Sequence, residues 1–343
     1  MSRDIIPARS TQAAGTTAIV PAVVMESGPN ARYAYEEFFA GLDSSHTARA
    51  YRHAVHRFLA WCDETGTPLG RVTPGFIGDY IKQLRADLKV RDGEPPRSRP
   101  ASKPTRKLHL AALRHFFDKL VTRHAIPLNP ALSVRGPKHA VAEGKTPAME
   151  PKQIRELLRT LPTVTSKGEP DLIGLRDRAV IATLVYTAAR AGAVAKLQRQ
   201  DFYTDGRQHY LRLDEKGGKV RAIPCRTDLH QYIEEYLVAL GDADPSTPLF
   251  RSMIRRTGAA SPMGMTSNDT LRMFKRRLLA AGLPSHIFKC HSLRASTATN
   301  LLEQGVELSD VQYLLGHSDP RTTKLYDRRR QSVTRNIVER IAI

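Results

Sequence analysis

Apolar residues recur with a helical period in the first third of the chain. The Ser44-Ser45 pair can cap a first helix, and Thr73-Pro74 can begin a second, because proline is tolerated in the first turn of a helix. A third apolar helix is predicted from about 105 to 124. The first helix would bury one face, made of Tyr51, Val55, Phe58, Leu59 and Cys62. This part of the chain is therefore predicted to be a helical domain.

The second half of the chain changes period twice. Helical spacing predicts a helix at 151–161 and a long apolar helix from about 171 to 189. Alternating residues at 209–213 and 220–224 predict two strands, joined by a tight turn with a Gly-Gly pair. Helices are expected again at 227–240, 267–281, 291–305, 308–315 and 334–342. The predicted fold class is mainly α, with a small antiparallel β-sheet in a mixed α/β second domain.

Proline and glycine mark the boundaries between these parts. At roughly 100–200 residues per domain, a chain of 343 residues suggests two domains. Residues 1–30 are expected to be a flexible tail, and 136–148 the interdomain linker, because the latter contains glycines and prolines without periodicity. The helical domain would span 31–135 and the second domain 149–343. The segment 91–104 holds four prolines and is expected to be a loop.

Positive charge narrows the class of partner. The chain has 53 Lys and Arg against 34 Asp and Glu, a formal net charge of +19, and such a surface attracts polyanions, above all nucleic acids. No apolar run approaches the roughly 18–20 residues of a membrane span, and no basic amphipathic helix favours a membrane surface. Three widely spaced cysteines suggest neither a disulfide framework nor a zinc site. We expect a nucleic-acid-binding protein of a reducing compartment, the cytoplasm.

Four stretches of the second domain offer the groups that phosphodiester transfer on DNA needs. That reaction needs rigid cations for the nonbridging oxygens, a nucleophile, and an acid for the departing 5′ oxygen. The first stretch is Tyr186-Thr187-Ala188-Ala189-Arg190, and the second is Lys216 in the predicted turn. The third is His291-Ser292-Leu293-Arg294. The fourth contains Leu315-Gly316-His317 and, nine residues after the histidine, Tyr326.

This ordered set resembles the lambda-integrase family of tyrosine recombinases. The family pattern is an Arg after a T-G-x motif, a Lys in a β-hairpin, H-x-x-R, and L-G-H followed nine residues later by Tyr. The matching positions here are Arg190, Lys216, His291, Arg294, His317 and Tyr326. Residues 105–120, followed by Asn129-Pro130, are also similar to the family's SAM-like, helical core-binding domain. The resemblance therefore spans about 44–343.

The resemblance implies a site-specific DNA recombinase. Its tyrosine would attack the scissile phosphate and form a 3′-phosphotyrosine, and strands would be exchanged through a Holliday junction. Arg190 and Arg294 would hold the nonbridging oxygens. His291 would assist as a base or hydrogen-bond partner, and His317 would help to fix the phosphate. Lys216 would be the general acid, although Lys219 is near enough in sequence to be an alternative.

The resemblance also implies partners. Neither a metal nor a cofactor is implied, because the covalent intermediate conserves the phosphodiester energy. Members act as four protomers on paired sites in double-stranded DNA, with the C-terminal segment docked on a neighbouring protomer. That docking face would consist here of Ile337, Val338, Ile341 and Ile343. Basic residues of the first domain could contact phosphates, which positions a protein without reading sequence: Arg97, Arg99, Lys103, Arg106 and Lys107.

Two positions depart from the family pattern. Ala188 stands where glycine is usual, and Ala193 stands where an acidic residue often supports the active site from behind. Three other functions share the chemistry or the fold of this family and are alternatives to the recombinase: a type IB topoisomerase, a telomere resolvase and a catalytically silent DNA-binding protein. The helical first domain and short C-terminal tail favour the recombinase over the topoisomerase. Telomere resolvases usually carry extra domains that are not evident in this sequence. The complete set of catalytic positions argues against the third.

Overall fold

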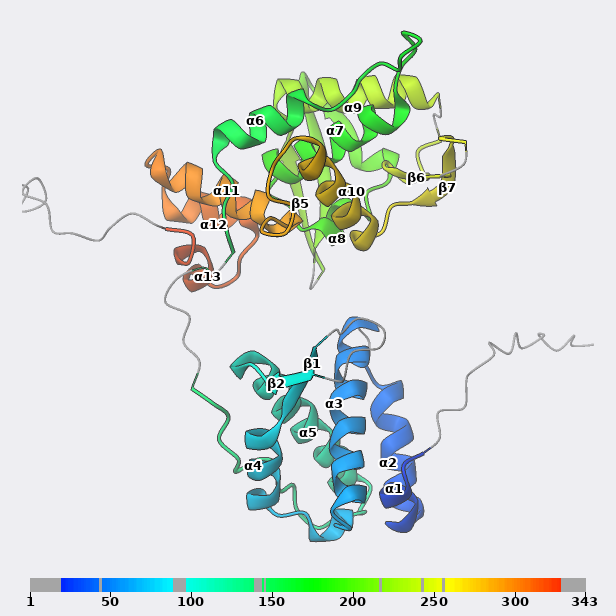
Figure 1. Cartoon of the computed structure of the whole chain (residues 1–343), viewed down its shortest axis with the longest axis vertical. Helices are drawn as coiled ribbons and strands as arrows, with labels where there is room; N and C mark the ends of the chain where they lie inside the picture. Colours follow the sequence, from blue (N-terminus) through cyan, green and yellow to red (C-terminus); the bar gives the residue numbers. More distant parts are fainter. Residues whose placement is uncertain are drawn as a thin grey trace, which may run out of the picture. The chain divides into compact units, whose positions relative to one another are not determined.

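The structure is a computed structural model that divides into two compact units. The residues that it describes are 20–42, 45–88, 97–138, 144, 146–215, 218–241, 244–254 and 257–327. The division falls between Ala140 and Val141, within the segment predicted as the linker. Each unit has its own buried apolar core, so each is described by itself (Figure 1).

Helices make up most of the N-terminal unit, and a small antiparallel hairpin joins two of them (Figure 1). Its elements in chain order are α1 (Ala22–Glu26), α2 (Pro29–Ala40), α3 (Ser45–Glu64), the 3-10 helix η1 (Leu69–Arg71), α4 (Pro74–Gln83), β1 (Arg85–Leu88), β2 (Arg97–Pro100) and α5 (Lys103–Thr122). Helix α5 packs against both α2 and α3. The three helices predicted here from periodicity correspond to α3, α4 and α5.

The predicted apolar face of α3 forms the centre of this core. Val55, Phe58 and Leu59 are fully buried, and they pack in one cluster with Phe116 and Phe117 of α5. The rings of Phe58 and Phe117 meet edge to face, with centroids 5.7 Å apart. Burying a side chain of this size contributes about 1.5–3 kcal/mol, so this cluster is the main source of stability in the unit.

The predicted boundary of the N-terminal tail is wrong for residues 22–26. They form α1, in which Val24 is fully buried, and the backbone N–H of Val23 donates to the Asp63 carboxylate at 3.0 Å. A single turn of helix is too short to show a period in the sequence. Part of the segment expected to be a tail therefore packs on α3.

The expectation of a loop over 91–104 is also wrong in part. Residues 97–100 form β2, which pairs antiparallel with β1 so that Arg85 lies opposite Pro100 and Ala86 opposite Arg99. Residues 97–100 are all polar or proline, so this strand shows no apolar alternation. Proline is tolerated in an edge strand, and both strands of a two-stranded sheet are edge strands, so Pro100 does not prevent the pairing.

The C-terminal unit combines helices with short antiparallel strands. Its elements are α6 (Pro151–Arg159), α7 (Leu172–Tyr186), α8 (Ala191–Val194), η2 (Arg199–Asp201), β3 (Phe202–Asp205), β4 (Gln208–Glu215), β5 (Lys219–Pro224), α9 (Thr227–Leu240), β6 (Arg251–Met253), β7 (Ala260–Gly264), α10 (Ser267–Ala280), α11 (Cys290–Glu303), α12 (Leu308–Leu315) and α13 (Pro320–Lys324). Figure 1 shows α11, α12 and α13 gathered at one end of the unit and β6 and β7 at the opposite end.

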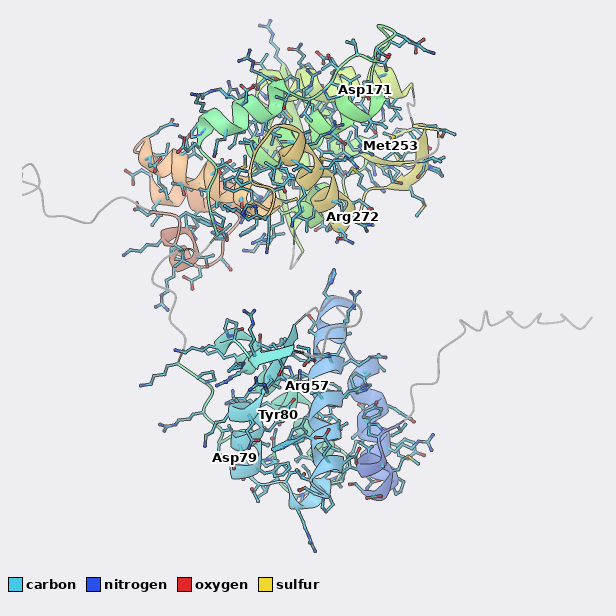
Figure 2. All side chains as sticks on the ribbon, in the orientation of Figure 1. Arg57, Asp79, Tyr80, Asp171, Met253 and Arg272 are labelled. Carbon is cyan, nitrogen blue, oxygen red and sulfur yellow. The ribbon has the colours of Figure 1, made fainter. Side chains whose placement is uncertain are left out.

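Helix α7 is the central helix of this unit. It packs against α6, α9, α10 and α11. The Asp171 carboxylate caps it by accepting the N–H of Gly174 at 2.9 Å (Figure 2). Residue 174 must be glycine, because a Cβ there would lie 1.8 Å from the carbonyl oxygen of Pro162. The long apolar stretch of the sequence is therefore a helix enclosed on several sides, and it leads directly to Arg190.

The predicted hairpin is confirmed as β4 and β5, with Glu215 opposite Lys219. Strand β3 extends it into the order β3-β4-β5, and β6 pairs with β7 as a separate sheet. Neither β3 nor the β6–β7 pair was expected, because these strands have three to five residues, too few for a visible alternation. Within the described residues, no helix is long and apolar enough to cross a membrane.

The end of the linker belongs to the C-terminal unit. The N–H of Gly144 donates to the carbonyl oxygen of Leu325 at 3.0 Å. A Cβ on residue 144 would come within 2.7 Å of the same oxygen, so only glycine allows this approach. Further along, the N–H of Met149 donates to the Ser296 hydroxyl at 2.7 Å.

Candidate active site

Five of the predicted catalytic residues come from segments that meet in the C-terminal unit. Arg190 stands immediately before α8, while His291 and Arg294 lie one turn apart on α11. His317 follows Gly316, which ends α12 in the left-handed conformation with φ 63°. Tyr326 follows shortly after α13. These chain positions lie far apart in sequence, and the contacts described below bring them together.

The Tyr326 side chain is buried against residues of its own chain. Its hydroxyl is 3.2 Å from Nε2 of His291, and the residue is 8% exposed. The ring lies parallel to that of His317, with centroids 6.1 Å apart. The backbone is held as well, because the Thr299 hydroxyl donates to the Tyr326 carbonyl at 3.2 Å.

Arg294 is the fully buried cation of the site. Its Nη1 donates to the carbonyl of Ala188 at 2.6 Å, and its Nη2 donates to the carbonyl of Leu315 at 2.6 Å. Nη2 also lies 2.8 Å from Nε2 of His317. A guanidinium in the interior is tolerated only when its N–H groups are paired. These contacts fix its plane and join α11 to the turn after α7 and to the end of α12.

The hydrogen bonds of His317 define its tautomer. An arginine can only donate, so Nε2 of His317 must be the acceptor for Arg294. The proton is therefore on Nδ1, which donates to the Thr323 hydroxyl at 2.9 Å. Burial, followed by the charges of Arg294 and Arg190, lowers the pKa of His317 to about 4. The imidazole is thus neutral near pH 7.

His291 is also held in its neutral form. Burial is the main cause that lowers its pKa, and the charges of Arg294 and Arg190 lower it further. A neutral imidazole can accept a proton from the phenol beside it. The charge of Arg190 acts on both His291 and His317, so this arginine lies near both histidines.

The architecture matches that of a known family in both units. Residues 147–332 match the phage integrase family, and residues 36–124 match the phage integrase N-terminal SAM-like domain. The chain belongs to the phage integrase family. The predicted resemblance to tyrosine recombinases and the predicted fold class are thereby confirmed, and this family member is an enzyme that cleaves and rejoins DNA in site-specific recombination.

Individual relatives of this phage integrase support the same conclusion. It is 28% identical over 292 residues to tyrosine recombinase XerD of Listeria innocua, with 82% of this chain and 88% of the relative covered. It is 28% identical over 289 residues to tyrosine recombinase XerD of Corynebacterium glutamicum, with 82% and 87% covered.

Solved structures share the fold of this family member. XerH site-specific recombinase bound to a palindromic difH substrate has a TM-score of 0.62 at 19% identity, over 81% of this chain and 75% of that one. A lambda integrase tetramer bound to a Holliday junction has a TM-score of 0.57 at 17% identity, over 92% and 84%.

The first departure from the family pattern has a clear geometry. Ala188 adopts a left-handed conformation with φ 50°, a region that favours glycine. This turn directs the Ala188 carbonyl toward Arg294. Thr187 braces the turn, since its hydroxyl donates to the Thr183 carbonyl at 2.6 Å and accepts the N–H of Ala189 at 3.2 Å. The chain therefore makes the glycine turn with alanine.

The second departure, Ala193, is packed rather than open. It is 6% exposed and lies in the main apolar cluster of the unit, with Val194 and Leu197. A carboxylate at this position would be buried among apolar side chains. The support that an acidic residue would give to the site is therefore replaced by apolar packing.

Several predicted residues lie outside the described residues or belong to the N-terminal unit. Lys216, in the turn of the β4–β5 hairpin, is outside them, as are the C-terminal segment 328–343 and the side chain of Arg97. Lys219 begins β5 and is exposed. The other predicted DNA contacts belong to the N-terminal unit: Arg99, Lys103, Arg106 and Lys107.

Sequence reasoning missed two residues that the structure places at this site. Thr323 is fully buried and accepts from His317, three positions before the nucleophile candidate. Arg221 faces inward from β5, and its charge acts on His317. The first could have been suspected from its position between His317 and Tyr326. The second shares the face of Ile223, because residues two apart on a strand point the same way.

Proposed function

We propose that Tyr326 is the nucleophile with which this enzyme breaks and rejoins DNA at specific sites. The observation that carries the proposal is the 3.2 Å contact between the Tyr326 hydroxyl and Nε2 of His291, on the helix that also carries Arg294. A nucleophile beside a neutral base and a fixed guanidinium is the arrangement that phosphoryl transfer uses.

The proposed step forms one bond and breaks one. The Tyr326 oxygen attacks the scissile phosphorus, the phenolic proton passes to His291, and the bond to the 5′ oxygen breaks. Arg190 and Arg294 stabilise the charge that develops on the nonbridging oxygens, and His317 helps to hold the phosphate. The product is a 3′-phosphotyrosine, which a 5′ hydroxyl of the partner strand can attack to complete the exchange.

The departing 5′ oxygen needs a proton, and we propose that Lys216 supplies it. The hairpin that carries this residue is present, with Glu215 paired to Lys219 on either side of the turn. Lys219 remains the alternative donor, since it is exposed at the start of β5. Replacing each lysine separately by alanine would distinguish the two. Only the loss of the true proton donor should slow cleavage, because the 5′ oxygen is a poor leaving group unless it is protonated.

We further propose that the N-terminal unit contacts the phosphates of double-stranded DNA. Lys103 and Lys107 are exposed in the first turns of α5, and Arg106 is half-buried between them. Cations at the start of a helix are unfavourable next to the positive end of its dipole, unless an anion lies nearby. Arg99, exposed on β2, and Arg97 on the same strand would extend this basic surface.

Assembly on DNA completes the proposal. The lambda integrase structure reported above is a tetramer on a Holliday junction, and we propose the same assembly here. Residues Ile337, Val338, Ile341 and Ile343 would dock on a neighbouring copy. A chain that ends before residue 331 should still bind one DNA site but fail to recombine two. Because the relatives reported above are named recombinases, recombination is favoured over relaxation by a type IB topoisomerase.

Trapping the covalent intermediate tests the proposed nucleophile. A DNA site would first be selected from random sequence by binding to the full chain, and then nicked near the cleavage point so that the released end is lost. We expect the wild-type chain to form an adduct that survives denaturing electrophoresis. The Tyr326→Phe variant should bind the site equally well and form no adduct.

A matched control uses another tyrosine close in sequence. Tyr313 on α12 is 77% exposed, so Tyr313→Phe should keep both binding and adduct formation. The proposal is overturned if wild-type chain binds its selected site but gives no adduct, or if Tyr326→Phe still gives one.

A further inference from the structure

The polarity of strand β5 is inverted near the turn of the hairpin. Val220 is 61% exposed, whereas Arg221 next to it is only 9% exposed. Arg221 points to the same side as Ile223, which is 5% exposed. Placing an arginine inside and a valine outside is unfavourable unless the arginine is paired there. The stability of the strand alone therefore does not explain why an arginine occupies this buried position.

Two contacts of Arg221 lie on a different element. Its Nη1 donates to the carbonyl of Leu314 and lies 3.5 Å from the carbonyl of Tyr313, in the last turn of α12. The last carbonyls of a helix have no partner within the helix, and they form its negative end. A guanidinium suits this position both as a donor and as a cation.

The next carbonyl along α12 is held by the catalytic candidate. Leu315 accepts from Nη2 of Arg294 at 2.6 Å, and Gly316 and His317 follow at once. The end of α12 is thus bound by two arginines from separate elements, one on α11 and one on the hairpin. The charge of Arg221 also acts on His317, which places it near the reaction centre.

We propose that Arg221 is a positioning residue that joins the turn end of the β4–β5 hairpin to the end of α12. Lys219 begins β5 two residues before Arg221, and Lys216 precedes it in the turn. The contact holds the lysine-bearing end of the hairpin in register with Arg294 and His317. This inference rests on the proposed function, in which a hairpin lysine protonates the departing 5′ oxygen.

Changing the leaving atom tests this inference. In a DNA site whose bridging 5′ oxygen is replaced by sulfur, the phenol attacks phosphorus and a 5′ thiolate departs without needing a proton. A thiol has a pKa of about 8.5, whereas the pKa of an alcohol is far higher and close to that of water. A fault in positioning the general acid therefore slows cleavage at oxygen and spares cleavage at sulfur.

We expect Arg221→Gln to slow single-turnover cleavage of the oxygen site by about 10–100-fold, the size of effect that a misplaced catalytic group produces. Cleavage of the sulfur site should stay within about 3-fold of wild type, because the acid is not used there. Arg221→Lys, which keeps the charge and one donor, should recover part of the loss at oxygen. DNA affinity should be unchanged in both variants.

The matched control is an arginine of the same hairpin. Arg212 on β4 is an outward residue with its side chain 48% exposed, paired to Asp201 at 2.9 Å. Arg212→Gln should cleave both sites at the wild-type rate. Thermal unfolding would show which variants are folded, and if Arg221→Gln is not, Arg221→Lys carries the same oxygen-to-sulfur comparison.

Two outcomes would overturn the inference: equal losses at oxygen and sulfur, which would mean that Arg221 acts on the phosphate or the nucleophile, and no loss at either. Failure of the proposed function looks different. In that case the wild-type chain itself gives no tyrosine adduct at the oxygen or the sulfur site.

Discussion

The carbonyl oxygen of Ala188 accepts a 2.6 Å hydrogen bond from Nη1 of Arg294. The two residues come from the end of α7 and from α11, and the left-handed turn at Ala188 aims the carbonyl. The bond thus couples a backbone conformation to the orientation of a guanidinium. Changes at residue 188 should therefore reach the reaction centre even though its side chain is a single methyl group.

Substitutions at Ala188 should depend on the left-handed conformation. A side chain there costs roughly 1–2 kcal/mol, while the buried methyl contributes about 0.8 kcal/mol and glycine adds freedom to the unfolded chain. These terms nearly cancel, so Ala188→Gly should change the free energy of unfolding by less than about 1 kcal/mol. Ala188→Val should destabilise the protein by about 3 kcal/mol or more and abolish cleavage, because branching at Cβ is poorly tolerated at positive φ. Urea unfolding and adduct formation would check both, and equal behaviour of the two variants would contradict the role of the turn.

Thr323 should control the tautomer of His317. Thr323→Val removes the acceptor for the Nδ1 proton and leaves a buried donor unpaired, which costs about 1–3 kcal/mol. We expect a changed tautomer signal of His317 in nitrogen NMR and cleavage slowed by about 10-fold or more. Thr323→Ser keeps the hydroxyl and should restore both. An unaltered His317 signal in the valine variant would show that the contact has no such role.

The half-buried His317 predicts a pH dependence of stability. The pKa of His317 is about 4 in the folded chain, lowered by burial and then by arginine charges, against roughly 6.5 when unfolded. As the pH falls from 6.5 toward 4, the unfolded chain takes up more protons, so the free energy of unfolding decreases. Above 6.5 the group contributes nothing. Stability should therefore fall more steeply between about pH 6.5 and 4 in the wild-type chain than in His317→Gln.

The comparison of these two proteins isolates His317. His109 in the N-terminal unit also has a pKa lowered to about 4, chiefly by burial, but it is present in both chains and cancels. Denaturant unfolding at several pH values, followed for the C-terminal unit, is the measurement. Parallel curves for the wild-type chain and His317→Gln would contradict the assignment.

The start of α5 should govern the salt dependence of DNA binding. Each phosphate contact contributes about 0.9 to the slope of log affinity against log salt, so replacing Lys103 and Lys107 by glutamine should lower the slope by about 1–2. The control is Arg32→Gln with Lys82→Gln. These cations are exposed but already paired with carboxylates of their own helices, Glu36 at 3.0 Å and Asp79 at 3.3 Å. If the control pair changes the slope as much as the α5 pair, phosphate contact at α5 is not supported.

Long periodic helices and the ordered set of chemical groups could be predicted from the sequence. Helix α3 and the β4–β5 hairpin have clear apolar periods, and tertiary packing uses the faces that those periods define. Short strands such as β2 and β7 have no such signal, because backbone pairing rather than side-chain burial holds them. Fold class is thus more visible than the small sheets that complete it.

The details of the site were harder to predict than its members. Alanine itself gives no sign of a left-handed conformation at residue 188, and only the glycine usual at this position of the family pattern points to it. The alternation over 220–224 predicts a strand, and the structure puts Arg221 on the buried side of that strand with Ile223. Both features depend on partners from distant segments, the Arg294 guanidinium for Ala188 and the Leu314 carbonyl for Arg221. Local patterns carry no information about those partners.

Gly144 determines where other modules could be grafted onto the catalytic unit. Its N–H is bonded to the backbone of Leu325, adjacent to Tyr326, and a larger residue would collide there. A hybrid enzyme that exchanges the N-terminal unit should therefore be spliced upstream of residue 144. A junction placed after residue 144 would remove the hydrogen bond that supports the backbone next to Tyr326.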